Sequence, residues 1–369
     1  MAQTAPLKKK AADPAAVHAS AIVVDTHADT PQRFLDEGFD LATDTPISEG
    51  HIDFGKVKKG NLGAEFFSIW VEPDANKGHY AKRAFELIDS VLQQAQRHPG
   101  EMTMAYSAAD IEKARRGPKK KFAALMGVEG GHAIENSLPI LRDFYRLGVR
   151  YMTLTWSNTN DWADSSGDIN DEKIQHHDGL APFGKEVVRE MNRLGMMVDI
   201  SHVADKTFWD ALETSKAPLV ASHSSMRAIS GHARNMTDDM VRALGAKGGV
   251  VMINYSVGFL SNERFEAQQK NVAAAELPRV SWEKIVEHID HAVKLVGAAH
   301  VGLGSDFDGT TVPDGMEDVS KLPKNTGALL AKGYSEQDVK NILGENILRL
   351  LERVDAVGRE LRGTRSGSQ

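Results

Sequence analysis

Short apolar runs alternate with longer amphipathic segments along most of the chain. Eight of these runs have the length and composition of β-strands, and several are apolar at consecutive positions, as in 249–253 (GVVMI). Continuous apolar runs are typical of parallel strands covered on both faces. The predicted strands are 21–25, 64–71, 122–128, 149–155, 196–201, 218–222, 249–254 and 300–305.

The segments between these runs have the pattern of helices. In 80–98 apolar residues recur every three or four positions, and 182–194 is followed by Gly195, a residue type that often ends a helix. Strand and helix alternate in this way about eight times without an obvious linker. This pattern predicts an α/β fold, a single (β/α)8 TIM-like barrel. A doubly wound open sheet is the alternative topology.

The barrel is expected to span 19–361 as one domain, between a flexible leader at 1–18 and a flexible tail at 362–369. No glycine-rich phosphate-binding loop follows a predicted strand, which argues against a nucleotide site.

Composition narrows the class of protein. Of 369 residues, 41% are hydrophobic and 26% charged, which is ordinary for a globular protein, and the net charge of −7 offers no basic stripe for nucleic acid. The lack of cysteine excludes disulfides and cysteine-ligated zinc. No run reaches the roughly 18 apolar residues of a membrane helix, and the N-terminus lacks an apolar signal region. We therefore expect a soluble protein, either cytoplasmic or exported with its signal peptide removed.

Metal-binding side chains recur at the carboxyl ends of the predicted strands. In a barrel these ends converge on the face where active sites are built. Each side chain alone would more often have a structural role, but five strand ends in chain order indicate a metal centre. The residues are His27, Asp29, Glu129, His202, His223 and Asp306.

Imidazoles combined with carboxylates suit zinc, and Mn²⁺ or Co²⁺ could substitute. Five ligands exceed the three of a single catalytic zinc, so we expect two metals that share one carboxylate and one hydroxide. Asp306 is then free to transfer protons.

Seven motifs across 21–350 together resemble a known family. They are VDTHAD (24–29), GVEGGH (127–132), YMTLT (151–155), DISH (199–202), SHS (222–224), HARN (232–235) and GSDFDG (304–309). The set resembles the membrane (renal-type) dipeptidases, zinc dipeptidases of the amidohydrolase-like barrel group.

The resemblance implies a ligand assignment. His27 and Asp29 would hold one zinc, and His202 and His223 the other. Glu129 would bridge both zinc ions.

The resemblance also implies roles around the metals. Asp306 would be the general acid and base, and Arg234 would bind the terminal carboxylate of the substrate through two parallel hydrogen bonds. Trp156 stands where the mammalian pattern has a histidine that is thought to steady the carbonyl oxygen. Phe259 lies near the position of a carboxylate-contacting tyrosine. Both are therefore candidate substrate-binding residues.

The leading hypothesis is a zinc-dependent dipeptidase that hydrolyses small dipeptides with a free carboxylate by means of a metal-bridging hydroxide. A related amidohydrolase acting on N-acyl amino acids or lactams, or a deaminase, is an alternative that the same ligands allow. A non-catalytic, metal-stabilised binding barrel is a third. A homodimer is expected only from the resemblance.

Overall fold

The computed structural model describes residues 12–46 and 49–363. Eight parallel strands pair in the order β1-β2-β4-β5-β6-β7-β8-β9, and the short strand β3 adds to the edge of β4. The strands are β1 Val23–Ala28, β2 Leu62–Trp70, β3 Met102–Met104, β4 Phe122–Glu129, β5 Val149–Thr153, β6 Met197–Asp199, β7 Val220–Ala221, β8 Val250–Ile253 and β9 Val301–Leu303.

The first and last strands meet and nearly close the barrel. Ala28 forms a parallel bridge with Phe307, the Asp29 N–H donates to the Phe307 carbonyl at 2.8 Å, and the Asp306 N–H donates to the His27 carbonyl at 3.0 Å. The prediction of a TIM-like barrel is confirmed, and the open sheet is excluded. All eight predicted strands are present, whereas β3 has only three residues and left no clear sequence signal.

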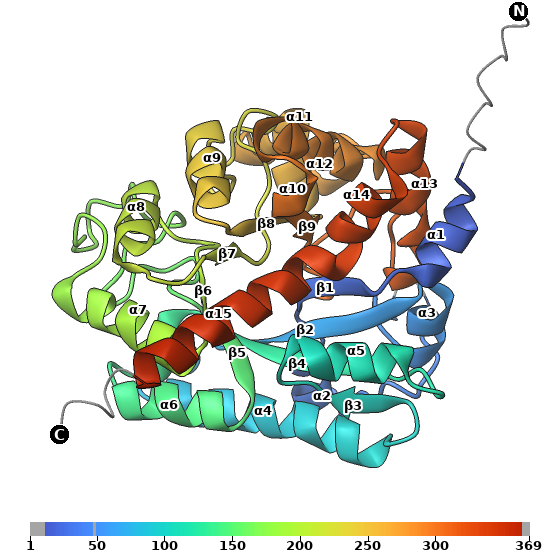
Figure 1. Cartoon of the computed structure of the whole chain (residues 1–369). Helices are drawn as coiled ribbons and strands as arrows, with labels where there is room; N and C mark the ends of the chain where they lie inside the picture. The colour runs from blue at the N-terminus through green and yellow to red at the C-terminus, as the bar shows by residue number, and fades with distance from the viewer. Residues whose placement is uncertain (1–11, 47–48, 364–369) are drawn as a thin grey trace, which may run out of the picture.

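Helices surround the barrel (Figure 1). The α-helices are α1 Pro14–Ser20, α2 Thr30–Asp36, α3 Phe54–Lys59, α4 Tyr80–Arg97, α5 Ala108–Arg116, α6 Leu138–Arg146, α7 Pro182–Leu194, α8 Asp205–Thr214, α9 Asp238–Ala246, α10 Val257–Leu260, α11 Asn262–Gln269, α12 Glu283–Val296, α13 Pro323–Ala331, α14 Glu336–Lys340 and α15 Asn346–Gly363. Short helical turns are η2 Gly131–Ile134, η3 Ala274–Glu276, η4 Ala298–His300, η5 Val319–Lys321 and η6 Asn341–Glu345.

Helix α15 covers one end of the barrel, and Figure 1 shows it lying across the strands. Its residues Ile347, Leu351 and Val354 belong to one buried cluster with barrel side chains such as Val24 and Phe66. Burial of this apolar surface closes the barrel at the amino ends of its strands. The opposite end, where the strands finish, stays free for polar side chains.

Local sequence explains several helix ends. Asp53 caps α3 by accepting the Lys56 N–H at 2.8 Å, and Ser335 with Asp338 forms the two reciprocal bonds of a capping box at α14. Helix α7 ends at Gly195, whose φ of 83° is left-handed and suits glycine.

The two chain ends differ from the expected domain limits. Helix α1 begins at Pro14, and Val17 and His18 on it are buried, so part of the expected leader is folded. The reason is local: Asp13 caps the helix and the His18 ring binds the Thr326 hydroxyl at 2.7 Å. Helix α15 likewise continues to Gly363, two residues into the expected tail. The rest of the expected leader and tail, 1–11 and 364–369, lies outside the described residues.

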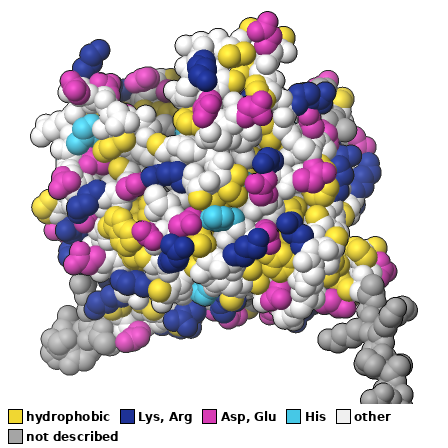
Figure 2. Space-filling view, turned by 90° about the horizontal axis from the view of Figure 1, so that it is seen from above, with side chains coloured by type: hydrophobic (Ala, Val, Ile, Leu, Met, Phe, Trp, Pro, Cys, Tyr) yellow, Lys and Arg dark blue, Asp and Glu magenta, His cyan; other side chains and the backbone are white. Residues whose placement is uncertain are grey.

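The surface carries mixed charge. On the face in Figure 2 acidic and basic side chains are interspersed, in keeping with the balanced composition. Among the described residues, no helix is both long and apolar enough to cross a membrane.

His288 on α12 is expected to make folding stability depend on pH. It is fully buried, and its Nδ1 accepts the Met226 N–H at 3.0 Å. A proton on Nδ1 would break this hydrogen bond and place two donors face to face. Burial lowers the pKa of His288 to about 4. This pKa is below the value of about 6.5 that a histidine has in the unfolded chain. The contribution of His288 to the free energy of unfolding is therefore fully present above pH 6.5 and is lost as pH drops towards 4, by up to about 3 kcal/mol. Urea unfolding of wild type and His288→Gln at pH 7 and pH 4.5 measures this effect. Equal loss of stability in both proteins would contradict it.

Candidate metal centre and substrate cavity

A cavity of about 930 Å³ opens at the carboxyl ends of the strands. Seven of the nine sequence-predicted site residues line it, and the other two, His27 and His223, are buried against Glu129. The structure therefore brings all nine together. The seven lining residues are Asp29, Glu129, Trp156, His202, Arg234, Phe259 and Asp306.

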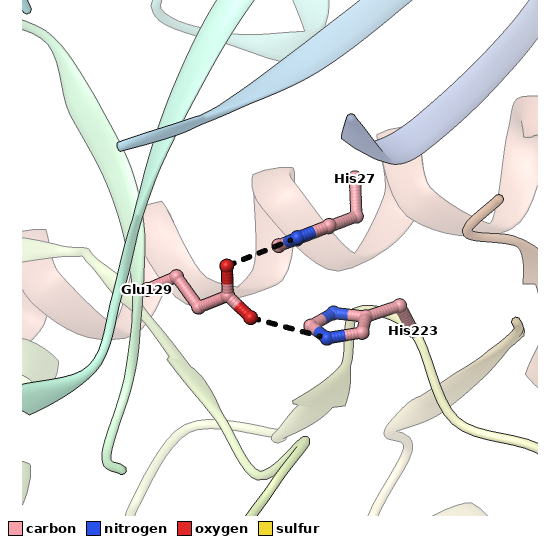
Figure 3. Close-up of side chains that lie close together, drawn as sticks. All are labelled: His27, Glu129 and His223. Carbon is pink, nitrogen blue, oxygen red and sulfur yellow. Dashed lines mark ion pairs between the residues drawn. The ribbon is translucent and has the colours of Figure 1, made fainter. Parts of the chain in front are cut away.

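Glu129, the last residue of β4, divides its two carboxylate oxygens between different histidines. Oε2 lies 3.3 Å from His27 Nε2, whereas Oε1 lies 2.8 Å from His202 Nε2 and 3.5 Å from His223 Nε2. Figure 3 shows His27 and His223 facing the two oxygens from separate strand ends. This is the geometry expected of a carboxylate shared by two metal ions.

A second group of candidate ligands surrounds His27. Asp29 Oδ2 lies 3.6 Å from His27 Nε2. One donor atom each from His27, Asp29 and Asp306 lies within 4.8 Å of the others. On the other side of Glu129, His202 Nε2 and His223 Nε2 are only 2.9 Å apart.

The outer nitrogens of the three imidazoles are held by hydroxyl groups. His27 Nδ1 binds the Tyr151 hydroxyl at 2.8 Å and His223 Nδ1 binds the Ser222 hydroxyl at 2.7 Å, while Ser157 is 3.4 Å from His202 Nδ1. These contacts turn every Nε2 towards the centre, just as hydrogen bonds to the outer nitrogen orient metal-bound histidines. His27 Nε2 is buried without a hydrogen-bond partner. The donor set therefore fits metal binding.

Charge at the centre also fits a cation. Burial alone would raise the pKa of Glu129, but the charge of His27 and hydrogen bonds from His202 and His223 outweigh it and hold that pKa well below its usual range. Burial opposes charge on His27, yet Tyr151 and Glu129 raise its pKa well above the usual value. The surrounding carboxylates therefore favour a proton on His27. A metal ion at this position would replace that proton.

The remaining two imidazoles are neutral. Burial, followed by the charge of Arg234, lowers the pKa of His202 to about 3. Burial and the charge of His27 lower the pKa of His223 well below its usual value. Neutral imidazole is the form that binds metals.

Asp306 lies beside this centre in a constrained position. It has a φ of 65°, which is uncommon for a residue other than glycine, and its Oδ2 accepts the Asn254 side-chain N–H at 3.0 Å. Burial and the negative charges of Asp29 and Glu129 raise the pKa of Asp306 to about 7. A carboxyl with this pKa can both take up and release a proton near neutral pH.

Arg234 is a buried cation with unused donors. The residue is 6% exposed, its Nη2 donates to the His223 carbonyl at 3.2 Å, and its Nε and Nη1 have no hydrogen-bond partner. Burial lowers its pKa to about 10, so it stays charged at neutral pH. Burying the N–H donors of a charged group costs free energy unless each donor has a hydrogen-bond acceptor. An anionic group of a ligand would supply that acceptor.

Aromatic rings form two walls of the cavity. The Trp156 ring lies 5.1 Å from the Trp70 ring and 6.4 Å from the His202 ring. Trp156 therefore borders the part of the cavity that contains the candidate metal ligands. The Phe259 ring lies 5.3 Å beneath the Arg234 guanidinium. Both residues therefore face the space that a substrate would fill.

Sequence reasoning missed several supporting residues. Tyr151 and Ser222 lay inside quoted motifs without a role, and Asn254 was visible only as a polar residue in an apolar run. Trp70 and Phe265, which also line the cavity, carried no local signal.

The chain is similar to known proteins over most of its length. The model of a family described as membrane dipeptidase (peptidase family M19) matches residues 12–365. Dipeptidase tcpJ of Claviceps purpurea is 38% identical over 323 residues, covering 85% of this chain and 72% of that protein. Human dipeptidase 3 is 34% identical over 346 residues, covering 92% of this chain and 66% of that protein, just under two thirds of its length.

Solved structures of two peptidases share the fold of this chain. A metallopeptidase from Rhodobacter sphaeroides, liganded with a phosphinate mimic of the dipeptide L-Ala-D-Ala, superposes with a TM-score of 0.77 at 29% identity, covering 91% of this chain and all of that one. The probable dipeptidase PvdM from Pseudomonas aeruginosa superposes with a TM-score of 0.82 at 25% identity, covering 93% and 98% of the two chains.

Proposed function

Because the chain belongs to the membrane dipeptidase family, peptidase family M19, and is a metallo-dipeptidase, we propose that it hydrolyses small dipeptides with a free terminal carboxylate at a two-zinc centre. The observation that carries this proposal is the division of the Glu129 oxygens between His27 on one side and His202 with His223 on the other. The unpaired donors of Arg234 in the same cavity support the choice of substrate.

Five side chains would hold the metals. His27 and Asp29 would bind one zinc, His202 and His223 the other, and Glu129 would bind both. When bound, the metal pair would activate a water as the nucleophile and would polarise the amide carbonyl.

The protein contributes positioning and proton transfer. Arg234 anchors the carboxylate of the substrate through two parallel hydrogen bonds, which fixes the scissile amide relative to the centre. Asp306 accepts a proton from the attacking water and passes it to the leaving amine, which must be protonated to depart. Trp156 and Phe259 line the space on either side.

A second candidate is the hydrolysis of N-acyl amino acids. It is favoured by the cavity volume of about 930 Å³, which lies near the upper end for small-molecule sites and can accept a longer acyl group. Arg234 would bind the carboxylate of these substrates in the same way.

Amino acid release from a panel of L-L and L-D dipeptides tests the proposal. The protein is stripped of metal and reloaded with zinc, and bound zinc is counted by elemental analysis. Zinc-dependent cleavage with two zinc ions per chain would support the proposal. Fully reloaded protein that cleaves no dipeptide would refute it, and cleavage of N-acyl amino acids in its place would favour the second candidate.

Arg234→Gln is expected to raise KM for dipeptides by about 10²-fold, because a neutral amide cannot replace the charged pair of donors. Dipeptide amides, which lack the carboxylate, should be poor substrates of the wild type and should lose little further in the variant. Steady-state kinetics on matched free and amidated dipeptides measures this difference. An equal loss on both substrates would show that Arg234 does not bind the carboxylate.

A further inference from the structure

Three aromatic rings form a continuous strip on one wall of the cavity. The His232 ring lies 4.5 Å from the Phe259 ring and 4.7 Å from the Phe265 ring, centre to centre. All three residues line the cavity. The strip begins at the Arg234 guanidinium, which lies over Phe259, and extends to helix α11.

Phe265 has no evident part in the core. It belongs to α11, which has no buried residue and is otherwise composed mainly of polar and charged side chains. Its ring contacts His232 and borders the cavity. A large apolar ring kept in this position is available to a ligand.

The strip is uncharged at its centre. His232 Nδ1 accepts the Arg234 N–H at 3.1 Å, as a neutral imidazole can. Burial, followed by the charges of Arg234 and Arg227, lowers the pKa of His232 to about 4, which keeps the ring neutral at physiological pH. The strip is therefore suited to apolar contact.

The position beside Arg234 decides which part of a substrate the strip can touch. In an amino acid the first side-chain carbon and the carboxylate carbon are both bonded to Cα, so they are only about 2.5 Å apart. A substrate whose carboxylate is bound by Arg234 can therefore place the side chain of that same residue close to Phe259. A longer side chain can continue along the strip.

On the basis of the proposed function, we propose that Phe259, His232 and Phe265 form a specificity pocket for the side chain of the carboxyl-terminal substrate residue, which selects large apolar and aromatic residues. Phe265, contributed by the otherwise exposed helix α11, sets the far end of this pocket. Short side chains would leave that end unfilled.

The test compares kcat/KM for alanyl-phenylalanine, alanyl-leucine and alanyl-glycine. Wild type should prefer phenylalanine to glycine at the carboxyl-terminal position by about 10-fold or more. Phe265→Ala should reduce that preference about 5- to 10-fold, and Phe265→Leu should reduce it less, because leucine keeps part of the apolar contact.

Two controls separate this role from a general one. Glu263→Ala changes an exposed residue of the same helix and should leave the preference unchanged. The ratio between phenylalanyl-glycine and alanyl-glycine, which differ at the amino-terminal residue, should not change in Phe265→Ala.

The outcomes are distinct. Cleavage with no dependence on the carboxyl-terminal residue, or a Phe265→Ala effect that is equal on all three substrates or confined to the amino-terminal residue, would overturn this inference alone. Wild-type protein that cleaves no dipeptide would overturn the proposed function, and this inference with it.

Discussion

Replacing Asp306 by asparagine is expected to lower kcat by about 10²- to 10⁴-fold while most of the bound metal remains. Asparagine has the same shape but cannot take up and return a proton. The Asn254 side-chain N–H that now donates to Oδ2 can still meet an amide oxygen, so the backbone at this strained position should survive the change. Steady-state kinetics combined with elemental analysis of the same preparations measures both effects.

The metal content decides how a loss of activity at Asp306 is interpreted. Asp306 contributes one of the oxygens near His27 and Asp29. Activity lost together with metal would make Asp306 a ligand, and undiminished activity would remove it from the mechanism. Asp308→Asn is a matched control on the same turn: its oxygens already accept from the His51 N–H and the Thr30 hydroxyl, so we expect it to change kcat by less than about 10-fold.

Replacing Glu129 by glutamine is expected to remove at least one metal and to lower kcat/KM by more than about 10³-fold. A glutamine side chain offers one oxygen and an NH₂ group, so it cannot present an oxygen to both sets of histidines. The loss of its negative charge also removes the group that attracts cations between three imidazoles. Zinc stoichiometry by elemental analysis and dipeptide hydrolysis measure the two parts of the effect.

Glu65 supplies the matched control for Glu129. It lies on β2, is fully buried, and neither of its carboxylate oxygens has a hydrogen-bond partner. Burial and the neighbouring Asp25 raise the pKa of Glu65 well above its usual value, which favours its protonated form. Glutamine resembles this protonated acid, and Glu65→Gln should therefore keep two zinc ions and full activity. If Glu129→Gln also keeps both metals, Glu129 does not bridge them.

The candidate ligands could be found in the sequence because each follows an apolar run. His27 and Asp29 come at the end of the first run, and Glu129, His202 and His223 follow later ones. Strand periodicity and strand ends are local properties, and the barrel fold converts a shared position at strand ends into proximity in space. This is why the complete predicted set lies around one cavity.

The supporting contacts could not be found in this way. The bond from Tyr151 to His27 joins residues 124 positions apart, and the Asn254 bond to Asp306 joins residues 52 apart. Which hydroxyl meets which ring depends on strand register and on the direction of each side chain. Neither quantity is fixed by the composition of a single run.

The sequence by itself determined the alternation of strands and helices, the kinds of ligand at the strand ends, and the absence of cysteine as a ligand. Those features depend on neighbouring residues and on side-chain chemistry. Only the tertiary structure decided that Glu129 turns one oxygen to each side, that Arg234 is buried with unused donors, and that Phe265 joins Phe259 through His232. These arrangements depend on barrel closure and loop packing, which bring together segments that are remote along the chain.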